Sequence, residues 1–267
     1  MSDPRRLRIM FTKTGKVRWT SHRDLARMWE RAIRRVGLPV AYSEGFSPRP
    51  KLHFGLALST GHESVAEYLD VDLMSEPDAD LATEIGLLDL PARLTPALPV
   101  GIEALVAAEI DRRTPSLQQA VTSCTWRVEV RGIDPDTLAA ATTRALAAPT
   151  LVLTRQRKGH DVTDDVRPYL LDLAVVGPTE AGAELQAHLA TQPRGLRVAE
   201  LLTVLARRPE DGDRGPVADG PGEEPGEAWQ EGRVRRTHQW TQLDGARSEP
   251  MALLGATSAP HAEARAS

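Results

Sequence analysis

The clearest periodic pattern in the chain lies in residues 21–37 and predicts an amphipathic helix. Apolar residues recur every three or four positions, as they do on one side of a helix, and they are Leu25, Met28, Trp29, Ala32, Ile33 and Val36. Ser21 and Asp24 have the spacing of a capping box, with Asp in place of the usual Glu. Gly37 follows the last apolar position, where a glycine commonly ends a helix.

Alternating apolar and polar positions predict strands on both sides of this helix. Residues 6–20 are expected to form a hairpin or a bent strand pair that turns at residues 13–16. Further along we expect strands at 38–42, 51–58 and 66–73, a helix at 78–88 and strand-like pieces within 92–110. Strand, helix, strand, strand, helix, strand is the order of a ferredoxin-like fold.

The same order of elements begins again after residue 110. Strands are expected at 125–130, 151–155 and 169–176, and helices at 135–146, 180–190 and 198–206. We therefore predict an α+β protein built as a duplicated ferredoxin-like (βαββαβ) sandwich, whose second copy lacks a clear closing strand. The predicted domains are a basic module at 1–110, a second α+β module at 111–207 and a disordered tail at 208–267, which is rich in Gly, Pro, Ala and Glu.

Charge is distributed unevenly along the chain, although the net charge is only −4. Residues 1–60 carry thirteen Lys or Arg against four Asp or Glu, a balance of +9, whereas residues 61–207 sum to −9. Such segregation favours an anionic partner for the first module. The chain has a single cysteine, Cys124, which excludes an internal disulfide and a cysteine metal cage. We expect a cytoplasmic protein without a membrane span, a metal or a cofactor.

Two cationic segments of the first module could hold that partner. On the predicted helix, five arginines fall within about a third of the circumference, and they are Arg23, Arg27, Arg31, Arg34 and Arg35. The loop at 42–58 contains cations, aromatics, two prolines and two glycines, so it is expected to be extended and partly prearranged. The alternative for the helix is an ordinary solvated face. We interpret both segments as a surface for a phosphate-bearing ligand.

No catalytic constellation stands out, so we expect no activity of the chain's own. His22 and His53 are the weak catalytic candidates, because they could converge in the basic module and one could act as a general acid or base. In the second module, the segment around Arg155, Arg157 and Lys158 is a second cationic loop, with Asp161, Asp164 and Asp165 as a weak metal signal. In the tail, Arg233–Trp240 could contact nucleic acid or a partner, or could belong to an inert segment.

The first 75 residues contain a distinctive set of residues, namely Arg18–Trp19, His22, Asp24, the run GFSPRPKL and Glu67–Tyr68. Through these residues the segment resembles the family of radical SAM-linked proteins. That domain of unknown function is fused to radical SAM enzymes or encoded beside them. The resemblance extends to about residue 205 through Ser116–Leu117, Arg157–Lys158–Gly159 and Arg194. The chain has no radical SAM module of its own, so it resembles the stand-alone form.

The resemblance and the basic surface together lead to one functional hypothesis and two alternatives. The resemblance implies a radical SAM enzyme as partner, and the charge favours RNA as ligand, so we expect an RNA-binding accessory protein that presents tRNA or rRNA to such an enzyme. The residues expected to contact RNA are Arg18, Trp19, His22, Arg23, Arg27, Arg31, Arg34, Phe46, Ser47, Arg49, Lys51, His53, Arg155, Arg157 and Lys158. The alternatives are a metal-independent endoribonuclease that uses a histidine and a protein–protein adaptor for a radical SAM enzyme.

Overall fold

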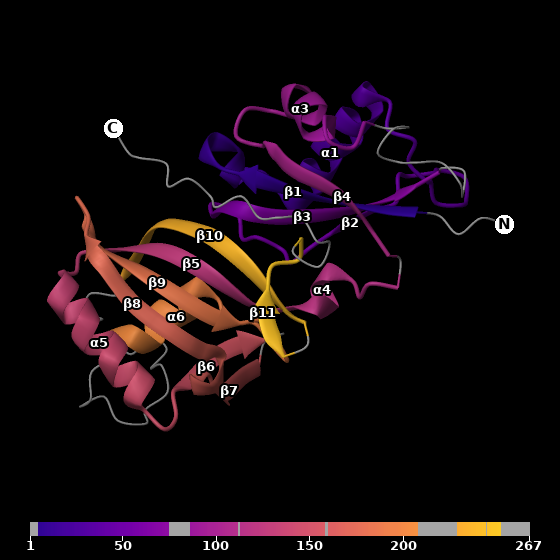
Figure 1. Cartoon of the computed structure of the whole chain (residues 1–267). Helices are drawn as coiled ribbons and strands as arrows, with labels where there is room; N and C mark the ends of the chain where they lie inside the picture. The colour runs from indigo at the N-terminus through magenta and orange to yellow at the C-terminus, as the bar shows by residue number, and fades with distance from the viewer. Residues whose placement is uncertain are drawn as a thin grey trace. The chain divides into compact units, whose positions relative to one another are not determined.

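The computed structural model describes residues 5–74, 86–111, 113–157, 160–207, 229–243 and 245–251 (Figure 1). These residues form an α+β protein whose strands are mostly antiparallel. The chain divides into two compact units. The first consists of Met1–Thr60, Ala66–Val121 and Trp240–Ser267, and the second of Gly61–Val65 and Thr122–Gln239. Each unit is therefore assembled from separate stretches of the chain.

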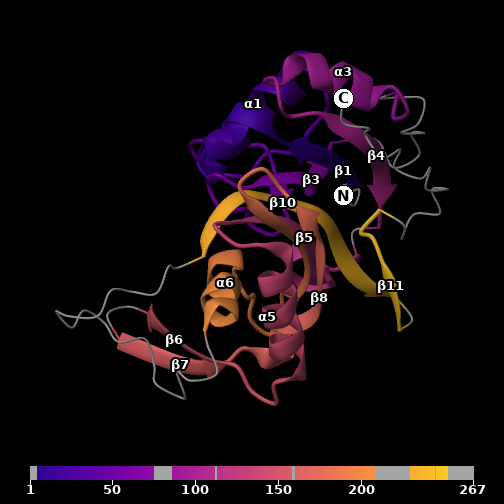
Figure 2. The same ribbon diagram turned by 90° about the vertical axis from the view of Figure 1, so that its left-hand side faces the viewer.

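In the first unit, one sheet carries helices on one of its faces. Its elements in chain order are β1 (Arg5–Lys13), the 3-10 helix η1 (Gly15–Trp19), α1 (His22–Val36), β2 (Leu52–Phe54), β3 (Glu63–Leu73), α3 (Leu90–Leu94), η2 (Thr95–Ala97), β4 (Ala104–Ile110) and α4 (Leu117–Ala120). The strand order is β4-β1-β3, with β2 paired to β3. Helices α1 and α3 lie on the same side of this sheet in Figures 1 and 2.

The predicted helix of the first unit is confirmed, together with both of its ends. Ser21 is the N-cap, and its hydroxyl accepts a hydrogen bond from the Asp24 backbone N–H at 3.1 Å. Gly37 ends α1 in the left-handed region at φ 72°, where a residue without Cβ is not strained. The apolar side of α1 packs on the sheet through Trp29, whose ring meets that of Phe11 edge to face at 4.9 Å.

Strand β1 is buried on both faces, which explains an error in the predicted hairpin. Leu7, Ile9 and Phe11 enter the core beneath α1, while Arg8 and Met10 on the opposite face are also buried. Because β1 already lies between β4 and β3, no edge remains for a hairpin partner. Residues 15–19 form the 3-10 helix η1 instead, and Thr20 closes it by donating to the Val17 carbonyl.

Other first-unit elements differ from prediction in extent. The strand expected at 38–42 reduces to two isolated bridges, Val40 with Leu73 and Tyr42 with Pro50. The strand expected at 51–58 is the short β2, and β4 is the strand found within 92–110. Most of the helix predicted at 78–88 lies outside the described residues, and 86–89 form a turn.

In the second unit, helices α5 and α6 lie on one face of a sheet ordered β10-β5-β9-β8 (Figures 1 and 2). Its elements are β5 (Val121–Arg131), α5 (Pro135–Ala147), β6 (Val152–Arg157), β7 (His160–Asp165), the 3-10 helix η3 (Arg167–Tyr169), β8 (Leu170–Pro178), β9 (Gly182–Ala190), α6 (Val198–Ala206) and β10 (Gln230–Leu243). Strands β6 and β7 form a separate two-stranded sheet. In β10, Arg235 pairs with Glu63 of β3.

The helix predicted at 180–190 is wrong, because this segment is strand β9. Every second side chain is buried there, through Ala183, Leu185, Ala187 and Leu189. This is the two-residue repeat of a strand with one covered face. Ala, Glu, Leu and Gln favour helix in isolation, and here the pairing of β9 with both β5 and β8 overrides that preference.

The prediction of a disordered tail from 208 to 267 is wrong for residues 229–251. Residues 230–243 form β10, the longest described strand, and β11 (Ala246–Ser248) pairs with its end. Strand β10 lies next to β5 on the side away from β9, so the second unit has a strand after α6 that the sequence did not predict. Residues 208–228 and 252–267 lie outside the described residues.

A basic surface on the first unit

The arginines of α1 form a solvent-exposed row. Arg23, Arg27, Arg31, Arg34 and Arg35 are all exposed. Within the described parts of the chain, only Arg27 of these five has an ion-pair partner, at 3.4 Å from Asp24, and that pair is itself half exposed. An exposed pair at this distance neutralises little charge. The row therefore leaves its positive charge available to an anion.

The loop that follows α1 is held at its base and exposed at its tip. The Ser43 N–H donates to the Arg49 carbonyl at 2.8 Å, and the Arg49 N–H donates to the Ser43 hydroxyl at 3.0 Å. Gly45 adopts φ 118°, which favours glycine. Phe46, Ser47 and Arg49 are exposed, and the Phe46 ring is completely uncovered, whereas Lys51 is half-buried. We call residues 43–51 the basic loop, and the α1 arginines with this loop the basic surface.

Trp19 and Arg18 form a second aromatic–cation group in the first unit, in which the indole is exposed and the arginine is half-buried. The Arg18 guanidinium lies 5.2 Å from the centroid of the Trp19 ring, and Trp19 is 62% exposed. Both side chains belong to η1, directly before α1. An exposed indole offers a flat face on which an unpaired base can stack.

His53 is oriented by a buried carboxylate. Its Nε2 lies 3.3 Å from Asp72 Oδ2, and Arg6 Nε donates to the other Asp72 oxygen at 2.7 Å. The Asp72 side chain is only 4% exposed, whereas that of His53 is 49% exposed. Burial raises the pKa of Asp72, but the hydrogen bond and charge of Arg6, together with His53, lower it below its usual range overall. Asp72 is therefore ionised at neutral pH.

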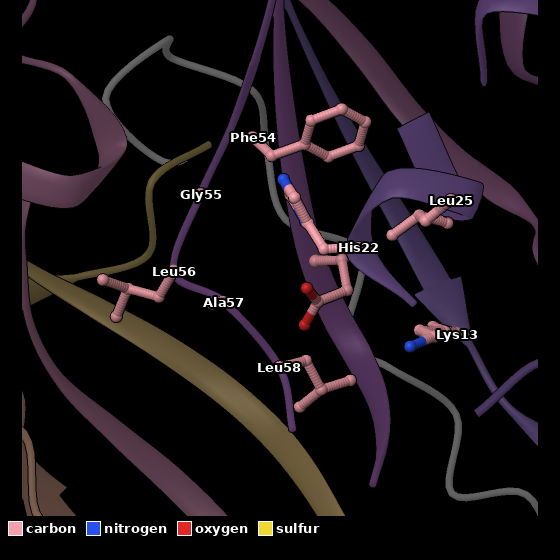
Figure 3. Close-up of a pocket in the computed structure, with 9 residues that line it drawn as sticks. Lys13, His22, Leu25, Phe54, Gly55, Leu56, Ala57 and Leu58 are labelled. Atoms are coloured by element: carbon pink, nitrogen blue, oxygen red, sulfur yellow. The ribbon is translucent and has the colours of Figure 1, made fainter. Parts of the chain in front are cut away.

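His22 lies on the opposite face of β2 from His53. Its ring meets Phe54 edge to face at 5.1 Å, and consecutive residues of a strand point to opposite faces. The two histidines therefore do not converge, contrary to the expectation from sequence. His22 instead borders a small pocket beneath the start of α1 (Figure 3), which is lined by Lys13, His22, Leu25, Phe54, Gly55, Leu56, Ala57, Leu58 and Glu67.

Two charged residues in this pocket were not singled out by their chemistry in the sequence. Lys13 and Glu67 are 2% and 6% exposed, and Lys13 Nζ donates to the Thr20 carbonyl at 3.1 Å. Each stands on the face of its strand that otherwise enters the core, with Phe11 and Leu69 as neighbours two residues away. A charged residue at a core position of an alternating strand is the signal that identifies them.

The cationic candidates of the second unit are engaged in ion pairs where their side chains are described. Arg155 contacts Asp164 at 3.1 Å and Glu200 at 3.4 Å, and Arg194 joins the same carboxylates. The backbone of Arg157 lies in β6, and Lys158 lies outside the described residues. In the Arg233–Trp240 segment, Arg233 and Arg235 contact Glu63, and Arg236 is buried over the Trp126 ring. These contacts of the arginines all lie within the second unit.

The chain is thus an α+β protein that carries a basic surface on its first unit. It belongs to a bacterial family described as an uncharacterized protein conserved in bacteria (DUF2344), whose model matches residues 6–199. The match includes the whole basic surface but ends before β10. No curated protein matches the chain. Among the described residues, no helix has the length and apolar character required to cross a membrane.

Proposed function

We propose that this protein binds RNA through the basic surface and acts as an accessory protein for an enzyme that modifies RNA. The observation that carries the proposal is the row of exposed α1 arginines, four of which have no ion-pair partner among the described residues, in the same unit as the uncovered Phe46 ring. The arginines contact phosphates, and Phe46 and Trp19 stack on unpaired bases. RNA is favoured over duplex DNA because exposed aromatic rings stack on unpaired bases, which RNA loops present and a DNA duplex does not.

A radical SAM enzyme is the proposed partner, and this part of the proposal rests on the sequence resemblance alone. In that arrangement, the basic surface holds tRNA or rRNA while the partner performs the chemistry. A protein–protein adaptor role would instead predict that the protein binds the enzyme and does not bind RNA.

We also propose that the two units are copies of one ferredoxin-like arrangement. Support comes from the order of their strands. The strand order is β4-β1-β3-β2 in the first unit and β10-β5-β9-β8 in the second. If the four strands of each sheet are numbered 1 to 4 along the chain, both sheets have the order 4-1-3-2. The β6–β7 hairpin is then an insertion between the first helix and second strand of the later copy.

The binding proposal is tested with total bacterial RNA and with single-stranded oligonucleotides, by titration at several salt concentrations. The variant Arg27→Glu/Arg31→Glu/Arg34→Glu is expected to lose binding. The wild-type affinity should fall with salt by about 0.7 logarithmic units per unit of log salt for each phosphate contact. The matched control Arg113→Glu/Arg131→Glu/Arg197→Glu changes net charge equally at three exposed positions elsewhere and should keep binding. Equal affinity of the two triple variants would refute the proposal.

A further inference from the structure

We propose that His53 is a general acid–base residue that cleaves RNA held by the basic surface. This inference rests on the proposed RNA binding and goes beyond it, since it assigns the protein an activity of its own. The geometry around one imidazole carries it, because the sequence offered both His22 and His53 as candidates and did not distinguish between them. All the residues involved belong to the first unit.

The position of His53 is fixed by the sheet. Strand β2 pairs with β3 so that His53 lies opposite Asp70, and the ladder continues through the Asp72 N–H, which donates to the Lys51 carbonyl at 3.1 Å. Asp70 does not compete for the imidazole, because both of its oxygens are bound by Arg8 at 2.7 and 2.8 Å. Asp72 is therefore the carboxylate that holds His53.

The carboxylate determines which ring nitrogen of His53 is free. Ionised Asp72 can only accept a hydrogen bond, so Nε2 of His53 must carry the proton that it shares with Oδ2. Nδ1 of the neutral ring is then a base. Among the described residues Nδ1 has no hydrogen-bond partner, and half of the side chain is open to solvent. An oriented imidazole with one free nitrogen is the arrangement of a positioned general base.

The surroundings of His53 suit a phosphodiester. Lys51 precedes His53 by two residues, so both side chains are expected on one face of the extended chain, next to the end of the basic loop. His53 contacts Asp72, and Arg6 binds the other oxygen of that carboxylate, whereas Arg8 and Asp70 neutralise each other. The Lys51 ammonium can stabilise the charge that builds on phosphoryl oxygens in the transition state.

The reaction that these groups support is transesterification of RNA. Nδ1 of His53 takes the proton of a 2′-hydroxyl, whose oxygen forms a bond to the adjacent phosphorus. The bond from phosphorus to the 5′-oxygen breaks, and the imidazolium returns its proton to that departing oxygen. The products are a 2′,3′-cyclic phosphate and a 5′-hydroxyl. The step consumes no water, metal or cofactor, and DNA cannot undergo it.

The test uses the full chain and total bacterial RNA in buffer containing EDTA, and it quantifies 2′,3′-cyclic phosphate ends. We expect cleavage by the wild type, and a loss of about 10²–10⁴-fold in His53→Ala. Imidazole added to His53→Ala should restore part of the rate, which a purely structural role would not allow. The control His160→Ala removes an exposed histidine of the second unit and should cleave normally.

Asp72 is tested as a positioning residue. Asp72→Asn should lower kcat without weakening RNA binding, and added imidazole should not rescue it, since the histidine is still present. If the wild type produces no more cyclic phosphate ends than His53→Ala, the inference is overturned. In that case, RNA binding by the wild type and by His53→Ala would still support the proposed function. The α1 triple variant tests RNA binding only, so its loss of binding gives no information on the chemistry of His53.

Discussion

Arg8 and Asp70 form a bidentate ion pair inside the first unit, with N–O distances of 2.7 and 2.8 Å. Their side chains are 0% and 2% exposed. The guanidinium also donates to the Pro250 carbonyl at 3.2 Å, so a residue near the C-terminal end of the described chain completes its hydrogen bonding. Two desolvated charges are thereby matched to each other across β1 and β3.

Asp70→Asn is expected to destabilise the protein by about 3–5 kcal/mol, because it leaves a buried guanidinium without its counter-charge. Urea unfolding followed by circular dichroism measures this. The control is Glu109→Gln, which breaks the Arg5–Glu109 pair between β1 and β4. That pair is partly exposed, at 19% and 38%, so its loss should cost at most about 1 kcal/mol. If the two variants lost similar amounts of unfolding free energy, burial of the Arg8–Asp70 pair would not determine how much that pair contributes to stability.

The lowered pKa of Asp72 makes part of the stability dependent on pH. A carboxyl group whose pKa is lower in the folded state stabilises that state above its unfolded pKa of about 3.9, and this contribution disappears as the pH falls through the folded pKa. The free-energy difference between wild type and Asp72→Asn should therefore shrink as the pH falls from 5 toward 2.5. A difference that stays constant over this range would contradict the assignment.

Phe46 is expected to contribute to RNA affinity without contributing to stability. Its ring is uncovered at the tip of the basic loop, so Phe46→Ser removes no packing. If one base stacks on it, affinity for single-stranded RNA falls by about 1–3 kcal/mol, while affinity for duplex RNA changes little. Phe46→Trp should retain the affinity. A Phe46→Ser protein that binds both RNAs as the wild type does would exclude stacking at this position.

Ending the chain at Arg207 is expected to abolish cooperative unfolding. The deletion removes β10 and β11, which exposes the edge of β5, and it takes away Pro250 and Met251, which contact or pack near Arg8 and Met10. The matched control ends at Met251 and retains every one of these contacts. The measurement is the cooperativity of thermal unfolding of the two proteins. A sharp transition in the shorter protein would show that both units fold without their last strands.

Local signals in the sequence predicted local structure well. Helix α1 was predicted with both caps because Ser21, Asp24 and Gly37 act within one turn of the backbone that they terminate. The exposure of the α1 arginines was predicted for the same reason, since the apolar stripe determines which side faces the solvent. That these arginines bind RNA stays a prediction.

Nonlocal relationships could not be derived in the same way. The pairing of His53 with Asp72 depends on the register between β2 and β3, and Arg6 joins them from a third strand, so no spacing in the sequence marks the group. Strand β10 was missed because it follows a long stretch of tail-like composition. In β9 the two-residue repeat was present, but helix-forming residues obscured it.

The division of the first unit between the two ends of the chain has a consequence for its synthesis. Residues 5–13 supply Arg8 and Met10, and residues 250–251 supply the groups that cover them, so translation must reach residue 251 before that interior is complete. During translation, Arg8 and Met10 therefore stay uncovered while the ribosome synthesises the second unit. Premature termination before residue 250 would thus release a product with an unfinished first unit, although α1 and its arginines would already be present.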